Sequence, residues 1–399
     1  MDISSERKRN YSSERDSKSA TESLDSFSLD VAGGDKQCVE QTGIFDDDND
    51  DHGQLASKRT IREEIISKFP QDNLIHCFGY GSGVFSQSLS DDKAVASSAG
   101  MLDLIMVVDN TWEFHRANLQ QFPQHYAPWL RYGGPDLVSK LQRQGIPWLH
   151  DAHVLFHVVD EDKHNTLPKM KYGVIDREDL ERDLTEWESL YLAGRLHKPT
   201  LSVVDNDDNL LRAKNKNLRA AMAAALMLLP PSTSKNSTVV PWSSLYRQIA
   251  ALSYTGDFRM QVGGEDPKKV DKLVQAPGQL QRFHNLYRPI LQFYETNGLL
   301  SVSHPSPSNE GGGIEWNSND PSGISFLRQQ LPRSLREGDA AKVTSNSLVS
   351  DHEALAKALA SIVAPAARNQ SFKGVFTLGF RKSIQYASAK LSKGLLSRK

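Results

Sequence analysis

The chain has 399 residues, 38 % of them hydrophobic, which is enough for two or three domains with real cores. Its net charge of −2 at pH 7 gives no general attraction to nucleic acid, and without a run of about 18 apolar residues it predicts no membrane-spanning helix. The two cysteines, Cys38 and Cys77, fit no metal-binding spacing, so we expect a reducing compartment and no disulfide partner.

Residues 1–58 are rich in Ser, Asp and Lys, and they include an acidic run at 46–51. Large apolar residues are scarce there, so the segment predicts a disordered acidic tail. A mitochondrial transit peptide is Arg-rich and poor in acids, and this segment does not look like one.

Residues 59–205 alternate between helix-like and strand-like patterns, which predicts one α/β or α+β domain. The helix at 112–119 should begin at a cap formed by Asp109, Asn110 or Thr111. The predicted strands are 74–80, 101–108, 153–159, 170–175 and 199–204, and the predicted helices are 61–69, 112–119, 135–144 and 179–194.

From residue 206 the chain becomes mostly helical, and 206–300 is predicted as a second domain. An alanine-rich helix at 210–229 contains the longest apolar stretch and ends before Pro230 and Pro231. Residues 301–323 read as a linker by composition. Further helices are predicted at 243–252, 267–275, 280–295, 324–335 and 352–363.

A glycine-rich block, FGYGSGVFSQ, occupies residues 78–87. Bare backbone amides at Gly81, followed by the hydroxyl of Ser82, suit a phosphate cradle, although glycine clusters also form ordinary tight turns. No Gly-Lys-Ser/Thr follows, which excludes a Walker A loop. A dinucleotide fingerprint fits poorly, because Phe85 and Ser86 stand where its third glycine would fall.

About twenty residues later, the strand-forming run MLDLIMVVDN (101–110) carries Asp103 near its start. This carboxylate is either a ligand for Mg²⁺ or an ordinary strand-end residue. A glycine loop followed by an acid-bearing strand is the layout of the nucleotidyltransferase superfamily, but its usual second acid is Ile105 here. Asp109 lies about 20 Å further along a strand, too far to share the ion. Candidates for a second ligand are Asp151, Asp176 and Asp257.

Residues 371–399 contain seven Lys or Arg and no acid, with apolar residues at helical spacing. This pattern is typical of a basic amphipathic helix on an anionic membrane surface, and the alternative is a terminal helix docked on the protein's own core. The residues predicted to bind the membrane are Phe380, Arg381, Lys382, Ile384, Leu391 and Lys393.

Several ordered segments between 75 and 379 resemble the mitochondrial phosphatidate cytidylyltransferases, also called translocator assembly and maintenance proteins. The resemblance implies an α+β fold: a nucleotidyltransferase-like mixed-sheet domain, a mostly helical winged-helix-like domain, and a C-terminal region (324–399) ending in an amphipathic membrane-binding helix. The segments are FGYGSGVFSQ (78–87), MLDLIMVVDN (101–110), FHRANLQQFPQHY (114–126), KYGVI (171–175), LYLAGRLHKP (190–199), LSYTGDFRM (252–260) and NQSFKGVFTLG (369–379).

The resemblance implies an enzyme that joins CTP and phosphatidic acid into CDP-diacylglycerol and pyrophosphate with Mg²⁺ as cofactor. A phosphate oxygen of the lipid would attack the α-phosphorus of CTP in line. The implied location is peripheral, on the matrix side of the mitochondrial inner membrane, where the product feeds phosphatidylglycerol and cardiolipin synthesis. The acidic N-terminus does not fit mitochondrial import.

Carried onto this chain, the resemblance implies that Gly81 and Ser82 hold the triphosphate, Asp103 binds Mg²⁺ and Lys171 stabilises phosphate charge. Lys171 is equally well explained as a solvated lysine at a strand end. Ser82, Asp103 and Lys171 are the expected catalytic residues.

Three further pairs are expected to bind substrate, each with a structural alternative. His115 and Asn118 share a helix face at i, i+3 spacing, and the alternative is a helix-surface role. Arg195 and Lys198 suit either a phosphate or a helix dipole. Asp257 and Arg259 would complete the nucleotide or lipid-phosphate site, or form a structural ion pair.

Two other functions remain open from sequence. The first is a nucleotidyltransferase whose acceptor is RNA or protein. An RNA acceptor would require a basic groove with interleaved aromatics, and the sequence shows none outside the tail. A non-catalytic peripheral membrane factor that supports protein translocation would not need Asp103.

Overall fold

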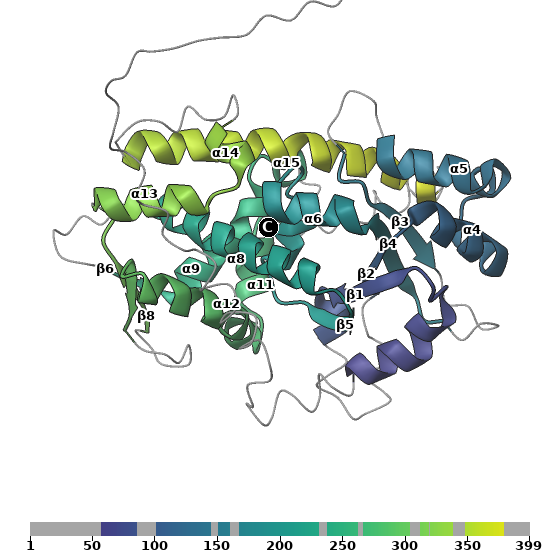
Figure 1. Cartoon of the computed structure of the whole chain (residues 1–399), viewed down its shortest axis with the longest axis horizontal. Helices are drawn as coiled ribbons and strands as arrows, with labels where there is room; N and C mark the ends of the chain where they lie inside the picture. Colours follow the sequence, from purple (N-terminus) through teal and green to yellow (C-terminus); the bar gives the residue numbers. More distant parts are fainter. Residues whose placement is uncertain are drawn as a thin grey trace, which may run out of the picture. The chain divides into compact units, whose positions relative to one another are not determined.

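The computed structural model describes residues 57–85, 101–144, 151–159, 167–230, 238–261, 266–303, 312–318, 320–337 and 348–378. These residues belong to one compact unit and combine a five-stranded sheet, a three-stranded sheet and many helices (Figure 1). The expected combination of helices with a mixed sheet is confirmed. The predicted tail lies outside the described residues, except for Ser57 and Lys58.

The larger sheet has the strand order β3-β4-β2-β1-β5. Strands β2 and β4 run parallel, and the other neighbouring pairs are antiparallel, so the sheet is mixed. The strand bounds are Leu74–Tyr80 (β1), Leu102–Val108 (β2), Leu155–Val159 (β3), Met170–Asp176 (β4) and Leu201–Asp205 (β5).

Both faces of this sheet are buried, because apolar residues occupy both sides of its central strands. On β2, Leu104 and Met106 belong to one hydrophobic core and Ile105 and Val107 to another. The first core is closed by the helical segment Ile61–Ile65. The second continues through the helices that follow the sheet, so the sheet and the helical region share one core.

Helix α4 (Thr111–Gln121) begins where the sequence predicts, because the Asn110 side chain accepts hydrogen bonds from the backbone N–H groups of Trp112 and Glu113. Helix α5 (Pro128–Gln144) packs against it and is kinked at Gly134, whose φ is 67°.

The single helix predicted over 179–194 is correct as far as Glu186 and wrong beyond it. Helix α6 (Arg177–Glu186) ends at Trp187, which adopts a left-handed conformation with φ 53°. An irregular loop follows, and only the short α7 (Ala193–Leu196) continues the helical pattern. Of the apolar residues in this stretch, Leu180 and Leu184 are buried on α6, whereas Trp187 and Leu190 are buried at its end and in the loop that follows.

Helix α8 (Asp208–Leu228) lies at the centre of the molecule and contacts helices on several sides, which explains its alanine-rich sequence (Figure 1). Around it lie α9 (Trp242–Ala251), α10 (Phe258–Gln261), α11 (Lys269–Gln275), α12 (Gln279–Thr296), α13 (Pro321–Gln330) and α14 (Arg333–Glu337).

The expected linker at 301–323 is wrong in part, because two strands of the smaller sheet lie there. This sheet has the order β6-β8-β7, with β6 at Thr238–Pro241, β7 at Leu300–Val302 and β8 at Gly313–Trp316. Gly313 permits the pairing, since a Cβ there would lie 2.1 Å from the carbonyl oxygen of Val240. Composition indicated a linker, but the pairing of β8 is decided by distant partners.

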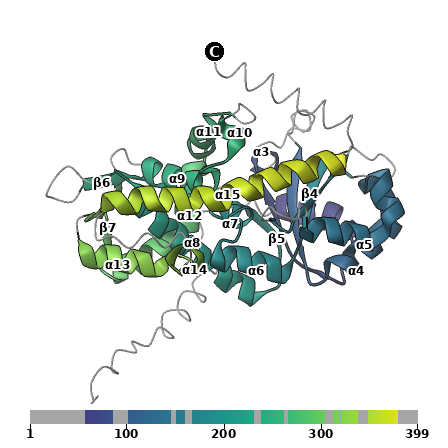
Figure 2. The ribbon, with the colours of Figure 1, turned by 90° about the horizontal axis from the view of Figure 1, so that it is seen from above.

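Helix α15 (Leu348–Leu378) crosses the molecule from the side of β7 and α13 to the side of α5 (Figure 2). It contains the whole of the predicted helix at 352–363 and extends into the predicted basic tail. Lys373, counted among the tail cations, is buried: its Nζ lies 2.5 Å from a carboxylate oxygen of Asp151 and 2.5 Å from the carbonyl oxygen of Gln142. The predicted membrane-binding residues, Phe380 to Lys393, lie outside the described residues.

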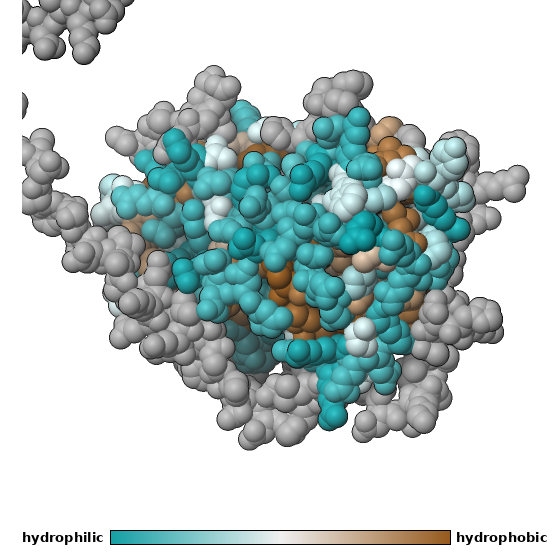
Figure 3. Space-filling view, turned by 45° about the vertical axis from the view of Figure 1, so that its right-hand side comes forward, coloured by the Kyte–Doolittle hydropathy of each residue, from teal (hydrophilic) through white to brown (hydrophobic). Residues whose placement is uncertain are grey.

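None of the helices described is long and apolar enough to cross a bilayer. On the face shown in Figure 3, hydrophilic residues dominate, and apolar ones are visible in limited areas between them.

Candidate active site

A cavity of about 530 Å³ lies where one edge of the five-stranded sheet meets α10, α11 and α15. It collects residues that lie far apart in the sequence. The residues expected from sequence that line it are Gly81, Asp103, Lys171, Arg195, Lys198, Asp257 and Arg259. Ser82 opens the short helix α3 (Ser82–Phe85) directly after Gly81, but its side chain lies outside what the structure describes.

Three side chains stand side by side on adjacent strands at this edge. Asp103 on β2 is paired with Tyr80 on β1 and with Lys171 on β4. The Tyr80 hydroxyl lies 3.5 Å from a carboxylate oxygen of Asp103. Burial raises the pKa of Asp103, and the positive charges of Lys171 and Arg195 oppose that shift. A cation bound at Asp103 would keep the carboxylate ionised.

Gly81 turns the chain at the end of β1 with φ +81°, a conformation that side chains rarely adopt. A Cβ there would lie 3.6 Å from a carboxylate oxygen of Asp103. The predicted glycine turn therefore lies directly beside the acid, as a phosphate cradle next to a metal ligand requires.

The loop between α6 and α7 is shaped by the buried carboxylate of Asp183. One oxygen accepts from the N–H groups of Ser189 and Leu190 and from the Ser189 hydroxyl, and the other accepts from the N–H groups of Leu192 and Ala193. These bonds fix the loop that presents Tyr191 and Arg195 to the cavity. Asp183 carries no recognisable motif in the sequence, because most of its partners are backbone groups.

The Arg195 guanidinium lies among aromatic rings, 4.4 Å from the centre of the Tyr80 ring and 5.0 Å from that of Tyr191. It also donates to the Tyr191 hydroxyl over 3.2 Å. Lys171 lies 4.2 Å above the Phe156 ring. Aromatic faces hold these cations in place without neutralising them.

Lys198 joins the sheet side of the cavity to the helical side. Its Nζ donates to the carbonyl oxygen of Gly194 over 2.6 Å and to the Ser253 hydroxyl over 2.8 Å. Burial lowers the pKa of Lys198 well below its usual value, and the charges of Arg195 and Lys269 add to the effect. An anion in the cavity would restore its charge.

Asp257 and Arg259 form a bidentate ion pair, with two Nε–oxygen distances of 3.0 and 3.1 Å and an Nη2–oxygen distance of 2.6 Å. The structural alternative therefore holds, although both residues also line the cavity. Among the candidates for a second metal ligand, only Asp257 lies here. Asp151 pairs with Lys373, and Asp176 caps α6 beside Arg143 at the other end of β4.

Other lining residues were not expected from sequence, and they include Tyr191 and two lysines of α11, Lys269 and Lys272. Burial acts to raise the pKa of Tyr191, but the positive charges of Arg195, Lys171 and others nearby outweigh it and lower that pKa. The lowered pKa records an excess of positive charge in the cavity.

The expectation that His115 and Asn118 contact substrate is not supported by their position. Both are fully buried and do not line the cavity. The amide of Asn118 donates to the hydroxyls of Tyr126 and Tyr172, and the two ring nitrogens of His115 bond to Tyr126 and Gln142. The shared helix face therefore turns into the core, and the surface alternative is wrong as well.

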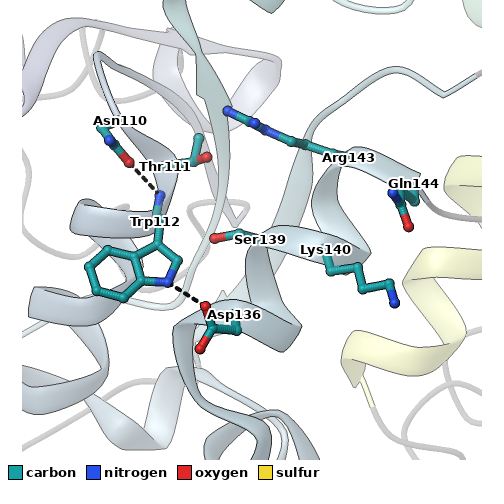
Figure 4. A pocket seen from close by; sticks show the side chains of 8 residues that line it. All are labelled: Asn110, Thr111, Trp112, Asp136, Ser139, Lys140, Arg143 and Gln144. Carbon is teal, nitrogen blue, oxygen red and sulfur yellow. Dashed lines mark hydrogen bonds between the residues drawn. The ribbon is translucent and has the colours of Figure 1, made fainter. Parts of the chain in front are cut away.

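A second cavity, of about 410 Å³, lies between α4 and α5 (Figure 4). Its one carboxylate, Asp136, accepts a hydrogen bond from the indole N–H of Trp112 over 2.8 Å, and the start of α4 is already capped by Asn110. None of the residues expected at the active site lines it. The first cavity is therefore the candidate active site.

Basic side chains outnumber carboxylates in the first cavity, which suits a polyanionic substrate. No cluster of three or more His, Cys, Asp or Glu that could hold a metal occurs among the described residues. Both carboxylate oxygens of Asp257 accept from Arg259, so Asp103 is the carboxylate that could hold a hard cation, with phosphate oxygens as its other ligands. The basic lining residues are Lys171, Arg195, Lys198, Arg259, Lys269 and Lys272.

The fold and the cavity thus define a mixed α and β protein with a site for a phosphate-bearing substrate. The model of the mitochondrial phosphatidate cytidylyltransferase family matches residues 62–393. The chain belongs to this family, which confirms the resemblance seen in the sequence.

Curated relatives carry the same name, mitochondrial phosphatidate cytidylyltransferase. The protein of Caenorhabditis elegans is 33 % identical over 345 residues, which cover 84 % of this chain and 98 % of the relative. That of Xenopus laevis is 34 % identical over 348 residues, covering 84 % and 94 %. That of Schizosaccharomyces pombe is 32 % identical over 339 residues, covering 80 % of each.

Proposed function

We propose that this protein transfers the cytidylyl group of CTP to phosphatidic acid, forming CDP-diacylglycerol and releasing pyrophosphate. The observation that carries the proposal is the pairing of Asp103 with Lys171 on adjacent strands, inside a cavity with an excess of positive charge. Family membership supports this reaction, and the positive charge of the cavity supports this location for it.

In the proposed reaction a phosphate oxygen of the lipid forms a bond to the α-phosphorus, and the bond from that phosphorus to the bridging oxygen breaks. Gly81 admits the triphosphate close to the backbone, and Lys171 and Arg195 stabilise the negative charge on the reacting phosphates. Asp103 would hold Mg²⁺, which would neutralise phosphate oxygens when bound. Arg259, held in place by Asp257, supplies a further positive charge from the helical side.

The finer assignments belong to the same proposal. The sheet region is a nucleotidyltransferase-like domain and the helical region is winged-helix-like. The protein acts in mitochondria, peripherally on the matrix side of the inner membrane, and supplies phosphatidylglycerol and cardiolipin synthesis. Residues 380–393 bind the anionic membrane, which predicts that a chain ending at Leu378 no longer floats with anionic liposomes. The cut must follow Lys373, because that residue is part of the core.

The test of catalysis incubates purified protein with labelled CTP, Mg²⁺ and liposomes that contain phosphatidic acid. We expect CDP-diacylglycerol from the wild type, none after chelation of Mg²⁺, and none from Asp103→Asn. Asp109→Asn is the matched control, since Asp109 directly follows the same strand and lies outside the cavity. If the wild type makes no product, the non-catalytic alternative is favoured. If it transfers the nucleotidyl group to RNA or protein instead, the protein is a nucleotidyltransferase with a different acceptor.

A further inference from the structure

Helix α11 presents two kinds of side chain to the active-site cavity. Lys269, Lys272 and Leu273 line it at i, i+3 and i+4 spacing, so basic and apolar residues share one helix face, and Ala276 lines it directly after the helix ends. Lys269 lies 5.4 Å from the centre of the Tyr254 ring. Lys272 pairs with Asp266 over 2.5 Å, and its side chain is 65 % exposed, which places it at the rim.

Helix α15 supplies a second apolar part of the wall. Val363 and Ala367, one helical turn apart, line the cavity and are almost fully buried. The turn that carries Asp257 fits closely against this helix, because a Cβ on Gly256 would lie 2.6 Å from that of Ala360. The apolar wall of α15 therefore adjoins the ion pair of Asp257 and Arg259.

The two substrates need different chemical surroundings. CTP is polar throughout and needs cations and hydrogen-bond donors. Phosphatidic acid is an anionic phosphate monoester joined to two acyl chains, so its phosphate needs cations directly beside apolar surface. The sheet side offers Asp103 and Lys171, whereas the α11 and α15 side offers cations that adjoin apolar residues.

We propose that phosphatidic acid binds on the helical side of the cavity, with its phosphate at Arg259 and Lys269 and its acyl chains between α11 and α15. This inference rests on the proposed function. CTP then occupies the sheet side, beside Gly81 and Asp103. The two phosphates meet between the two walls, which is where the lipid oxygen must attack.

The first test is Ala367→Trp, which fills the proposed acyl-chain path. We expect the KM for phosphatidic acid to rise at least about tenfold, while the KM for CTP stays within about twofold. Arg368→Trp is the matched control, because Arg368 is the next residue of α15, is exposed and does not line the cavity. Equal increases in both KM values, or an unchanged KM for phosphatidic acid in a folded variant, would overturn the proposal.

The second test is Lys269→Met, which removes the charge and keeps most of the side-chain length. We expect the same selective rise in the KM for phosphatidic acid, with partial rescue by Lys269→Arg. A rise confined to the KM for CTP would assign Lys269 to the nucleotide and contradict the proposal.

Direct binding separates this inference from the proposed function. If the wild type makes no CDP-diacylglycerol, the proposed function fails, yet titration with dihexanoyl phosphatidic acid still reports on the site. We expect Ala367→Trp to weaken that binding at least about tenfold relative to Arg368→Trp, with CTP binding unchanged. Equal affinity of the two variants for the lipid would overturn the inference alone.

Discussion

The two faces of strand β4 differ sharply in how they treat buried polar groups. Lys171 faces the cavity beside Asp103, among cations held by aromatic rings. Its neighbour Tyr172 faces the other core, where its hydroxyl accepts from Asn118 and pairs with a ring nitrogen of His125. The first face lines a cavity with more cations than carboxylates, whereas the second joins neutral groups in pairs. An excess of one sign, rather than burial itself, marks the functional face.

The largest effect should follow from removing charge on the cavity face. Lys171→Met should lower kcat/KM by roughly two to three orders of magnitude, since it removes a preorganised charge aimed at the reacting phosphates. The melting temperature should stay nearly unchanged, because methionine keeps most of the length of the lysine side chain and can still cover Phe156. Steady-state kinetics and thermal melts measure both, with the exposed Lys169→Met as control. If a folded Lys171→Met protein retains its activity, the charge on the cavity face of β4 is not needed for catalysis.

The neutral face should make the protein sensitive to acid. Burial lowers the pKa of His115 to about 4, against a hydrogen bond to Gln142 that acts to raise it. Between pH 6.5 and 4 the unfolded chain therefore binds a proton at His115 that the folded protein does not, and the free energy of unfolding falls as the pH falls. The loss should approach about 3 kcal/mol across this window. About 2 kcal/mol of this loss should fall between pH 7 and pH 5, where urea titrations measure it.

In His115→Gln the free energy of unfolding should depend less steeply on pH, because glutamine carries no titrating ring. A wild-type stability that is the same at pH 7 and pH 5 would show that the network does not hold its histidines neutral.

Breaking the neutral network should cost stability and leave catalysis intact. Asn118→Leu removes the amide that donates to Tyr126 and Tyr172, which should lower the free energy of unfolding by about 2 kcal/mol. The exposed Gln120→Leu on the same helix should change it by less than about 0.5 kcal/mol. At a temperature where both variants are folded, kcat/KM should match the wild type. A selective loss of activity in Asn118→Leu would return Asn118 to the active site.

The smallest effect concerns the glycine turn. Gly81→Ala and Gly298→Ala each place a side chain at positive φ, +81° and +70°, and each should lower the free energy of unfolding by about 1 kcal/mol. Only Gly81→Ala should raise the KM for CTP, since Gly298 lies outside the cavity. Equal CTP kinetics in the two variants would reduce Gly81 to an ordinary turn residue.

The sequence predicted a helix or strand correctly where neighbouring residues alone determine it. Strand β1, helix α4 and its Asn110 cap follow from neighbouring residues, so the pattern was sufficient. The helix predicted over 179–194 was wrong beyond Glu186, because a loop fixed by Asp183 follows there. Strand β8 was missed in a glycine-rich segment, because its pairing depends on strands β6 and β7.

By itself the sequence determined the family, the glycine turn, the acid on β2 and most of the basic residues of the cavity. Only the tertiary structure decided which of them meet. Spacing on a helix shows which residues share a face, but not what that face packs against. The face of His115 and Asn118 packs into the core, and Lys373, predicted in the basic tail, is buried beside Asp151. Long-range packing also brought α11 and α15 to the cavity, and with them the wall where we place the lipid.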